Sequence, residues 1–267
     1  KLEDYKSLST QVKDLVSELK DINIPVTTIK RHSKSLYNAL LGGIDVLAID
    51  NVHIIPDDIL HYLPFELLVF NDTYVLNQTK VSYASALSFI NSPIHNTKKN
   101  GKIALFAPSY SLFTPSNKQL AVRGEPYYLE GALKEVSSIS KLFENSDVYT
   151  NDKASKASFK SLSPNYSILH LSMHSFLNDN DSELSSLVFS DDDEDHKLYI
   201  SELYGLNLNA DMAVLSACNT GVGELKTGKG IVSMNTAFTA AGVPSVLSSL
   251  WSAPDDATQE IMVSFYK

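Results

Sequence analysis

His174 and Cys218 are the two residues of this sequence that could act together as a base and a nucleophile. Cys218 is the single cysteine of the chain. The thiolate is the reactive form of a cysteine, and an ordinary thiol, with a pKa of about 8.5, needs a nearby base to form it at neutral pH. The competing interpretation is a buried cysteine that packs as a small hydrophobic residue. The segments that position the two residues decide between these interpretations.

Both residues stand at the ends of apolar segments that are typical of buried strands. The segment "YSILHLSMHS" covers residues 166–175, and "MAVLSACNT" covers residues 212–220. Near-continuous apolar runs of this kind are typical of parallel strands that are covered on both faces. Ligands of such sheets bind beyond the carboxyl ends of the strands. We therefore expect His174 and Cys218 at neighbouring strand ends, where the imidazole could take the proton of the thiol.

The second part of the chain alternates strand and helix patterns, which predicts an α/β fold with a predominantly parallel sheet flanked by helices. Further strands are expected at 102–110, 146–151 and 245–251, and helices at 131–144, 153–162, about 230–241 and the end of the chain.

The first part of the chain has a different pattern and is expected to form a separate lobe. Helices are expected at 5–20 and 34–41, followed by short strands at 45–50 and 53–56. The polar stretch "SPIHNTKKNG" then acts as a linker, which gives two domains, 1–98 and 101–267. Short strands cannot bury both of their faces alone, so this lobe should pack against the sheet.

Composition excludes several classes of function. The 267 residues carry 31 acidic and 22 basic side chains, a net charge of -9, which argues against direct binding to nucleic acid or to an anionic membrane. A single cysteine cannot form an internal disulfide or a paired-thiolate zinc site, and it suits a cytoplasmic protein. Five further histidines show no metal-ligand spacing, so no metal or cofactor is expected; they are His32, His53, His61, His95 and His196.

Three other features have a functional and a structural interpretation. The segment "GELKTGKG", ending at Gly230, is similar to a phosphate-binding loop between a strand and a helix, but it lacks the final Ser or Thr. The acidic run 190–196 could bind calcium, although a solvated hairpin tip is the simpler interpretation. His170 lies deeper in its strand than catalysis needs, which indicates a structural histidine.

Four separated motifs resemble the CHAT domain, a caspase-like peptidase module often fused to TPR repeats. They are "HIIPDDILHYLPFELLV" with "VSYASALSFI", then "ILHLSMHSF", "MAVLSACNTGVGE" and "TAFTAAGVPSVLSSLWSAPDDAT". The resemblance, which extends more distantly to separases and caspases, implies a caspase-like sheet. It also implies a cysteine endopeptidase with His174 as base and Cys218 as nucleophile. The backbone amides of Ser175 and Cys218 would form the oxyanion hole.

The same resemblance implies a substrate preference and a form of regulation. In "SSLWSAPDD", Asp255 matches the separase aspartate that recognises a basic P1 residue, whereas the alternative is that Asp255 or Asp256 caps the last helix. Residues 1–98 would be a degenerate lobe, and 101–267 a catalytic lobe that continues beyond this fragment. The enzyme would be latent until a partner or a fused TPR region activates it on a protein substrate. The alternative is a silent caspase-like scaffold for protein interaction.

Overall fold

The computed structural model describes residues 5–84, 86–90, 101–110, 130–178, 180–190, 195–216, 224–226, 230–251 and 255–267. The chain divides into two compact units, Lys1–Pro93 and Ile94–Lys267. None of the described helices combines the length and the apolar character that crossing a membrane requires.

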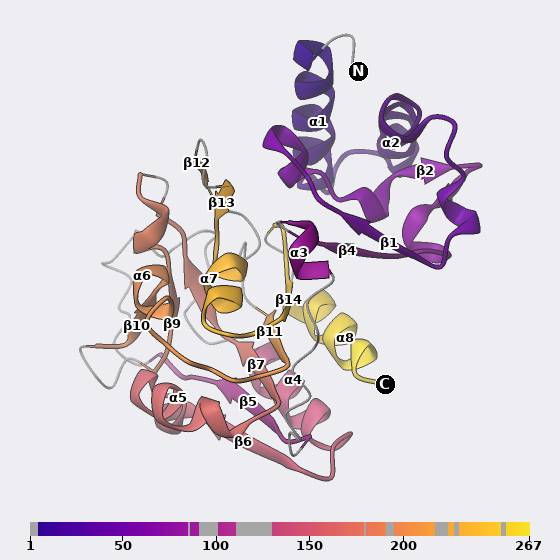
Figure 1. The fold of residues 1–267 in the computed structure, drawn as a ribbon. Coiled ribbons are helices and arrows are strands. Elements are labelled where there is room, and N and C mark those ends of the chain that lie inside the picture. Colours follow the sequence, from indigo (N-terminus) through magenta and orange to yellow (C-terminus); the bar gives the residue numbers. More distant parts are fainter. Residues whose placement is uncertain are drawn as a thin grey trace. The chain divides into compact units, whose positions relative to one another are not determined.

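A five-stranded parallel sheet forms the centre of the second unit (Figure 1). Its strands, in spatial order, are β14 (Ser245–Ser248), β11 (Met212–Ser216), β7 (Ile168–Ser172), β5 (Ile103–Ala107) and β6 (Ser146–Thr150). This arrangement confirms the α/β fold and the parallel sheet predicted from the apolar runs. It also places the strands that lead to His174 and Cys218 side by side.

Helices cover both faces of the sheet because alternate residues of each buried strand point to opposite faces. On one face, Phe106 and Leu171 join a core that includes Phe159 of α5 and Phe238 of α7. On the other face, Leu105 packs with residues of α4 and α8. The helices involved are α4 (Glu130–Ser140), α5 (Lys156–Leu162), α6 (Ile200–Leu203), α7 (Met234–Ala240) and α8 (Asp255–Phe265).

A small antiparallel sheet continues from the end of β7. It has the order β10-β9-β8, with β8 (His174–Phe176), β9 (Ser186–Val188) and β10 (Lys197–Tyr199). The single strand expected over 166–175 is therefore wrong: the chain bends at Met173, and β8 pairs with β9 instead of with the parallel strands. The expected hairpin around 190–196 is confirmed by the pairing of β9 with β10, while its tip, residues 191–194, lies outside the described residues.

A buried lysine holds the base of this hairpin. Lys156 on α5, whose side chain is only 5% exposed, donates to Asp195 at 2.6 Å and to Glu202 of α6 at 2.8 Å. A cation with so little access to water is stable only when it is paired in this way. The hairpin is thereby tied to α5 and α6 of the central core.

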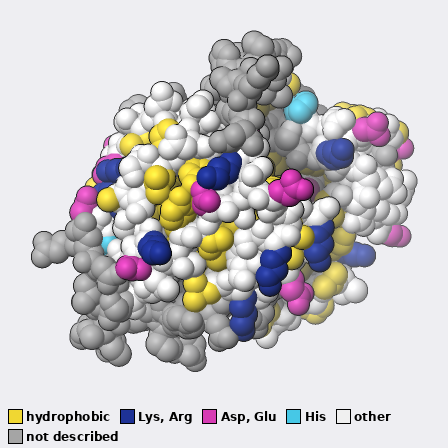
Figure 2. Space-filling view, turned by 90° about the horizontal axis from the view of Figure 1, so that it is seen from below, with side chains coloured by type: hydrophobic (Ala, Val, Ile, Leu, Met, Phe, Trp, Pro, Cys, Tyr) yellow, Lys and Arg dark blue, Asp and Glu magenta, His cyan; other side chains and the backbone are white. Residues whose placement is uncertain are grey.

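The first unit contains two long helices, α1 (Tyr5–Leu19) and α2 (Val26–Leu41), with a core that includes Leu15 and Leu36. Its short elements are β1 (Asn51–Ile54), β2 (Val69–Phe70), β3 (Thr73–Tyr74), β4 (Lys80–Tyr83) and α3 (Leu87–Ile90). The helix expected at 34–41 begins earlier, directly after Pro25, and the strand expected at 45–50 is instead a short 3-10 turn at Val46–Ala48. Figure 2 shows one face of the molecule, on which Lys and Arg side chains are interspersed with Asp and Glu side chains.

Candidate active site

His174 is the first residue of β8 and lies just beyond the carboxyl end of β7. Its side chain is half-buried, and its Nε2 atom is covered and has no hydrogen-bond partner among the described residues. Burial lowers the pKa of His174 below the ordinary value of 6.5, because removal from water disfavours the charged imidazolium. The imidazole is therefore mainly neutral at neutral pH, which is the form that can accept a proton.

Tyr110 contacts both the ring and the backbone of His174. The two ring centroids are 4.8 Å apart, with an angle of 45° between the ring planes. The backbone N–H of His174 donates to the Tyr110 hydroxyl at 3.0 Å, and that hydroxyl donates to the backbone carbonyl of Val188 at 2.9 Å. Sequence analysis missed Tyr110, although its position three residues after β5 places it at the same edge of the sheet.

The register of β7 and β11 relates the two candidate catalytic positions. Ser172 at the end of β7 pairs with Ser216 at the end of β11, and every pair in this ladder is 44 residues apart in sequence. His174 and Cys218 are also 44 residues apart, and each lies two positions after one of these serines. Cys218 itself belongs to residues 217–223, outside the described part of the chain.

Ser175 and Asp255 are the other two predicted site residues. Ser175 follows His174 in β8 and pairs with Leu187 of β9, so its backbone amide is adjacent to the candidate base. Asp255 is the first residue of α8, and its side chain lies outside the described part. A carboxylate in the first turn of a helix is favourable because of the helix dipole. The place of Asp255 at the start of α8 therefore agrees with the capping interpretation and with the substrate-binding interpretation.

His170 has a structural role, as its place within the strand predicted. It is fully buried, its Nε2 lies 2.7 Å from Oε1 of Glu135 on α4, and its Nδ1 lies 3.2 Å from the Tyr266 hydroxyl. Glu135 is also buried, at 2% exposure. These contacts occupy both ring nitrogens of His170, so the ring ties β7 to the helices on one face of the sheet.

The phosphate-binding interpretation of residues 223–230 is wrong in its structural context. A phosphate-binding loop runs from a strand directly into a helix. Here β12 (Glu224–Lys226) and β13 (Gly230–Val232) pair as an antiparallel hairpin. Helix α7 begins only at Met234, and Ser233 caps it by accepting from the Thr236 amide, so the helix expected from about 230 starts later.

Within the described residues, no cluster of three or more His, Cys, Asp or Glu side chains could hold a metal ion.

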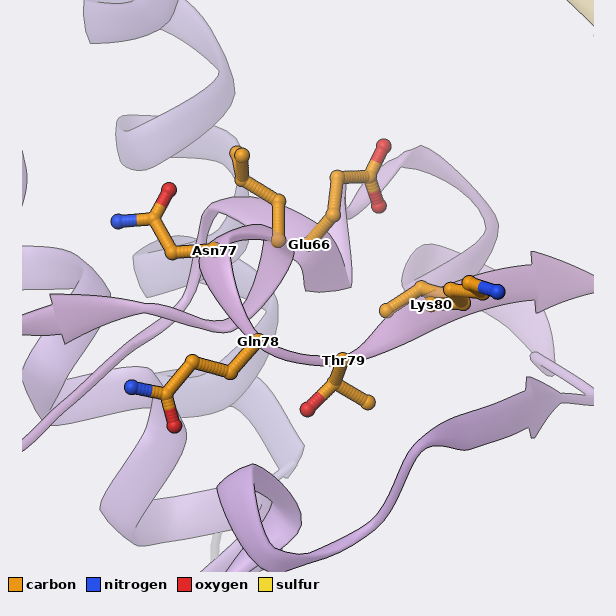
Figure 3. Close-up of a pocket in the computed structure, with 7 residues that line it drawn as sticks. Glu66, Asn77, Gln78, Thr79 and Lys80 are labelled. Atoms are coloured by element: carbon orange, nitrogen blue, oxygen red, sulfur yellow. The ribbon is translucent and has the colours of Figure 1, made fainter.

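A hollow of about 500 Å³ lies in the first unit (Figure 3). Two of its polar residues are already paired: Thr79 donates to the Val46 carbonyl, and Glu66 accepts from the Tyr83 hydroxyl. The hollow is lined by Glu66, Leu76, Asn77, Gln78, Thr79, Lys80 and Val81. This lining has no nucleophile with an adjacent base, so we do not regard it as an active site.

Comparison with known proteins identifies one family. A family model described as the CHAT domain matches residues 30–267, which is most of the chain and includes parts of both units. No curated protein is significantly similar to this chain.

Proposed function

Because the chain belongs to the CHAT domain family, which is caspase-like and related to cysteine peptidases, we propose that it is a cysteine endopeptidase. In this proposal His174 is the general base and Cys218 is the nucleophile. The backbone amides of Ser175 and Cys218 donate to the oxyanion. The substrate is a protein, and the enzyme is latent until a regulatory partner or a TPR-type region acts on it.

The shared register of β7 and β11 is the observation that carries this proposal. Ser172 and Ser216 pair across neighbouring parallel strands, and each precedes its reactive residue by two positions. Two residues of chain span at most about 7 Å, which limits how far the thiol can lie from the end of β11. This limit supports a base and a nucleophile at the same edge of the sheet.

The state of His174 supports the proposed proton transfer. Burial lowers its pKa, so its neutral form is available at neutral pH, and its Nε2 has no hydrogen-bond partner among the described residues. The Cys218 thiol would give its proton to Nε2, and the thiolate would attack the scissile carbonyl carbon. The imidazolium then protonates the leaving amine as the peptide bond breaks, and water hydrolyses the resulting thioester.

Asp255 gives the proposal a substrate preference. An aspartate at the base of a partly desolvated pocket would bind an arginine or lysine P1 side chain by a charge-assisted hydrogen bond and would repel an acidic one. The position of Asp255 at the start of α8 supports a fixed backbone for such a carboxylate. A basic P1 residue is therefore the first to test.

The proposal is tested with peptidyl acyloxymethyl ketones that vary at P1 and become attached to a catalytic cysteine. The intact chain should be labelled at Cys218, and both Cys218→Ala and His174→Ala should abolish labelling without unfolding the protein. His53→Ala is the matched control, because His53 is exposed on β1 of the first unit and contacts Ser82. Labelling that persists in His174→Ala would contradict the proposal. A chain that is never labelled, with or without partners, would favour a scaffold for protein interaction.

A further inference from the structure

We propose that Tyr110 is a positioning residue that holds His174 toward the end of β11, an inference that rests on the proposed peptidase function. Tyr110 is buried, and it follows β5 by three residues. It would act through His174 and not on the substrate itself.

The Tyr110 hydroxyl bridges two residues that face each other across β8 and β9. His174 and Val188 are register partners in this antiparallel pair. The hydroxyl accepts from the His174 N–H at 3.0 Å and donates to the Val188 carbonyl at 2.9 Å. The hydroxyl thus holds the His174 N–H, at the start of β8, and the Val188 carbonyl, at the end of β9. The bridge fixes the backbone of the candidate base and, one residue later, the direction of the Ser175 amide.

The ring of Tyr110 restrains the side chain of His174. The ring centroids lie 4.8 Å apart, within the range of aromatic contact. Tyr110 is buried and His174 is half-buried, so the Tyr110 ring occupies one side of the imidazole and excludes rotamers that would point there. The hydroxyl and the ring of one residue therefore set both the backbone and the side chain of His174.

The strand order explains why Tyr110 can do this from a distant part of the sequence. β7 lies between β5 and β11 in the parallel sheet. Tyr110 follows β5 in the sequence, whereas Cys218 follows β11, the strand on the other side of β7. In the proposed role, the contact with Tyr110 directs the imidazole toward β11, the strand that Cys218 follows.

Tyr37 provides a matched control for the loss of the hydroxyl. It is buried in the core of the first unit, where its hydroxyl donates to the Ile44 carbonyl at 2.5 Å and accepts from the Val46 N–H at 3.3 Å. Tyr110→Phe and Tyr37→Phe therefore each remove a hydroxyl that bridges a backbone N–H and a backbone carbonyl. Both variants leave two backbone groups without this partner, at a similar cost in stability.

The test measures the rate at which iodoacetamide alkylates Cys218 between pH 5.5 and 9, at a temperature below the unfolding transition of each variant. Cys218 is the single cysteine, so the modified mass reports this thiol alone. Tyr110→Phe should slow alkylation near pH 6.5 by about tenfold, since a displacement of about 1 Å in a catalytic group has effects of this order or more. Its profile should shift toward that of His174→Ala, whereas Tyr37→Phe should match the unmodified chain.

The outcomes separate this inference from the proposed function. If His174→Ala slows alkylation and Tyr110→Phe does not, the role of Tyr110 is refuted while the Cys–His pair stands. If His174→Ala leaves the rate unchanged, the proposed pair itself fails. Hydrogen exchange on the unmodified chain is a second measurement that needs no variant: the His174 amide should exchange slowly, and rapid exchange at this position would refute the bridge.

Discussion

Ser172 and Ser216 pair in register at the carboxyl ends of two neighbouring parallel strands, and each precedes a chemically reactive residue by two positions. Parallel pairing aligns strand ends at one edge of the sheet. Paired residues of β7 and β11 are 44 positions apart in sequence, and so are His174 and Cys218. The two residues therefore follow their strands at equivalent positions. The proposed peptidase function requires this relationship between β7 and β11.

We predict that His174 titrates below pH 6.5 in the Cys218→Ala variant, which removes coupling to the thiol. Burial lowers its pKa in the folded state, so the unfolded chain binds its proton more readily. His174 therefore contributes stability that is complete above about pH 6.5 and is lost as the pH falls through 6.5 toward the folded-state pKa. Observation of the His174 ring by NMR across pH 4–8 gives the value directly.

The same shift predicts a change in the pH dependence of stability. The free energy of unfolding should fall more steeply between pH 7 and pH 5 in the Cys218→Ala protein than in the double variant that also carries His174→Gln. Equal slopes, or a His174 pKa at or above 6.5, would show that the ring is not desolvated in the folded protein.

We predict that His170→Ala destabilises the fold by about 3–5 kcal/mol, because it removes a fully buried ring and leaves the Glu135 carboxyl group buried without its hydrogen-bond partner. The matched control is His32→Ala, which removes a pair of similar length, 2.8 Å, from Glu18, with the two side chains 36% and 18% exposed. Such an accessible pair contributes about 1 kcal/mol or less. Urea unfolding of both variants compares the two losses.

The His170 prediction includes a coupling measurement. His170→Leu combined with Glu135→Leu should cost less than the sum of the two single changes, since the double variant leaves neither side chain buried without its partner. Additive losses would contradict a direct interaction between these two side chains.

We predict that Asp255→Asn reduces cleavage or labelling by substrates with a basic P1 residue and that Asp256→Asn does not. Both residues lie in the first turn of α8, so the two changes alter the helix dipole interaction to a similar extent. A P1-varied peptide library measured with both variants separates substrate binding from helix capping. A basic preference that survives Asp255→Asn, or an equal effect of both changes, would support the capping role.

Much of the fold could be predicted because the buried strands appear in the sequence as near-continuous apolar runs. The apolar runs that contain β5, β7 and β11 are covered on both faces, so they lack the alternation of half-buried strands. The first unit was predicted less well. Its strands are only two to four residues long, and Val46–Ala48 forms a 3-10 turn where a strand was expected, because short apolar runs do not distinguish these structures.

Only those residues of the candidate site could be predicted whose side chains have an evident chemical role and follow a recognisable strand. His174 could be found because it follows a recognisable strand, but the bend at Met173 and the transfer of β8 to a second sheet depend on tertiary pairing with β9. Tyr110 has no motif of its own, and its contact with His174 exists because β5 and β7 are neighbours. The roles assigned to Cys218 and Asp255, and the packing of the N-terminal lobe on the sheet, stay predictions.

The separation of His174 Nε2 and Cys218 Sγ tests the central claim most directly. It can be measured in a crystal structure of the chain after reaction with a peptidyl acyloxymethyl ketone that carries a basic P1 residue. We predict that the inhibitor is attached to Cys218 and that the two atoms lie within about 4 Å of each other, slightly beyond ordinary hydrogen-bond reach because the sulfur is alkylated. Side chains on opposite faces of β11, or an unmodified Cys218 buried in the core, would contradict the account.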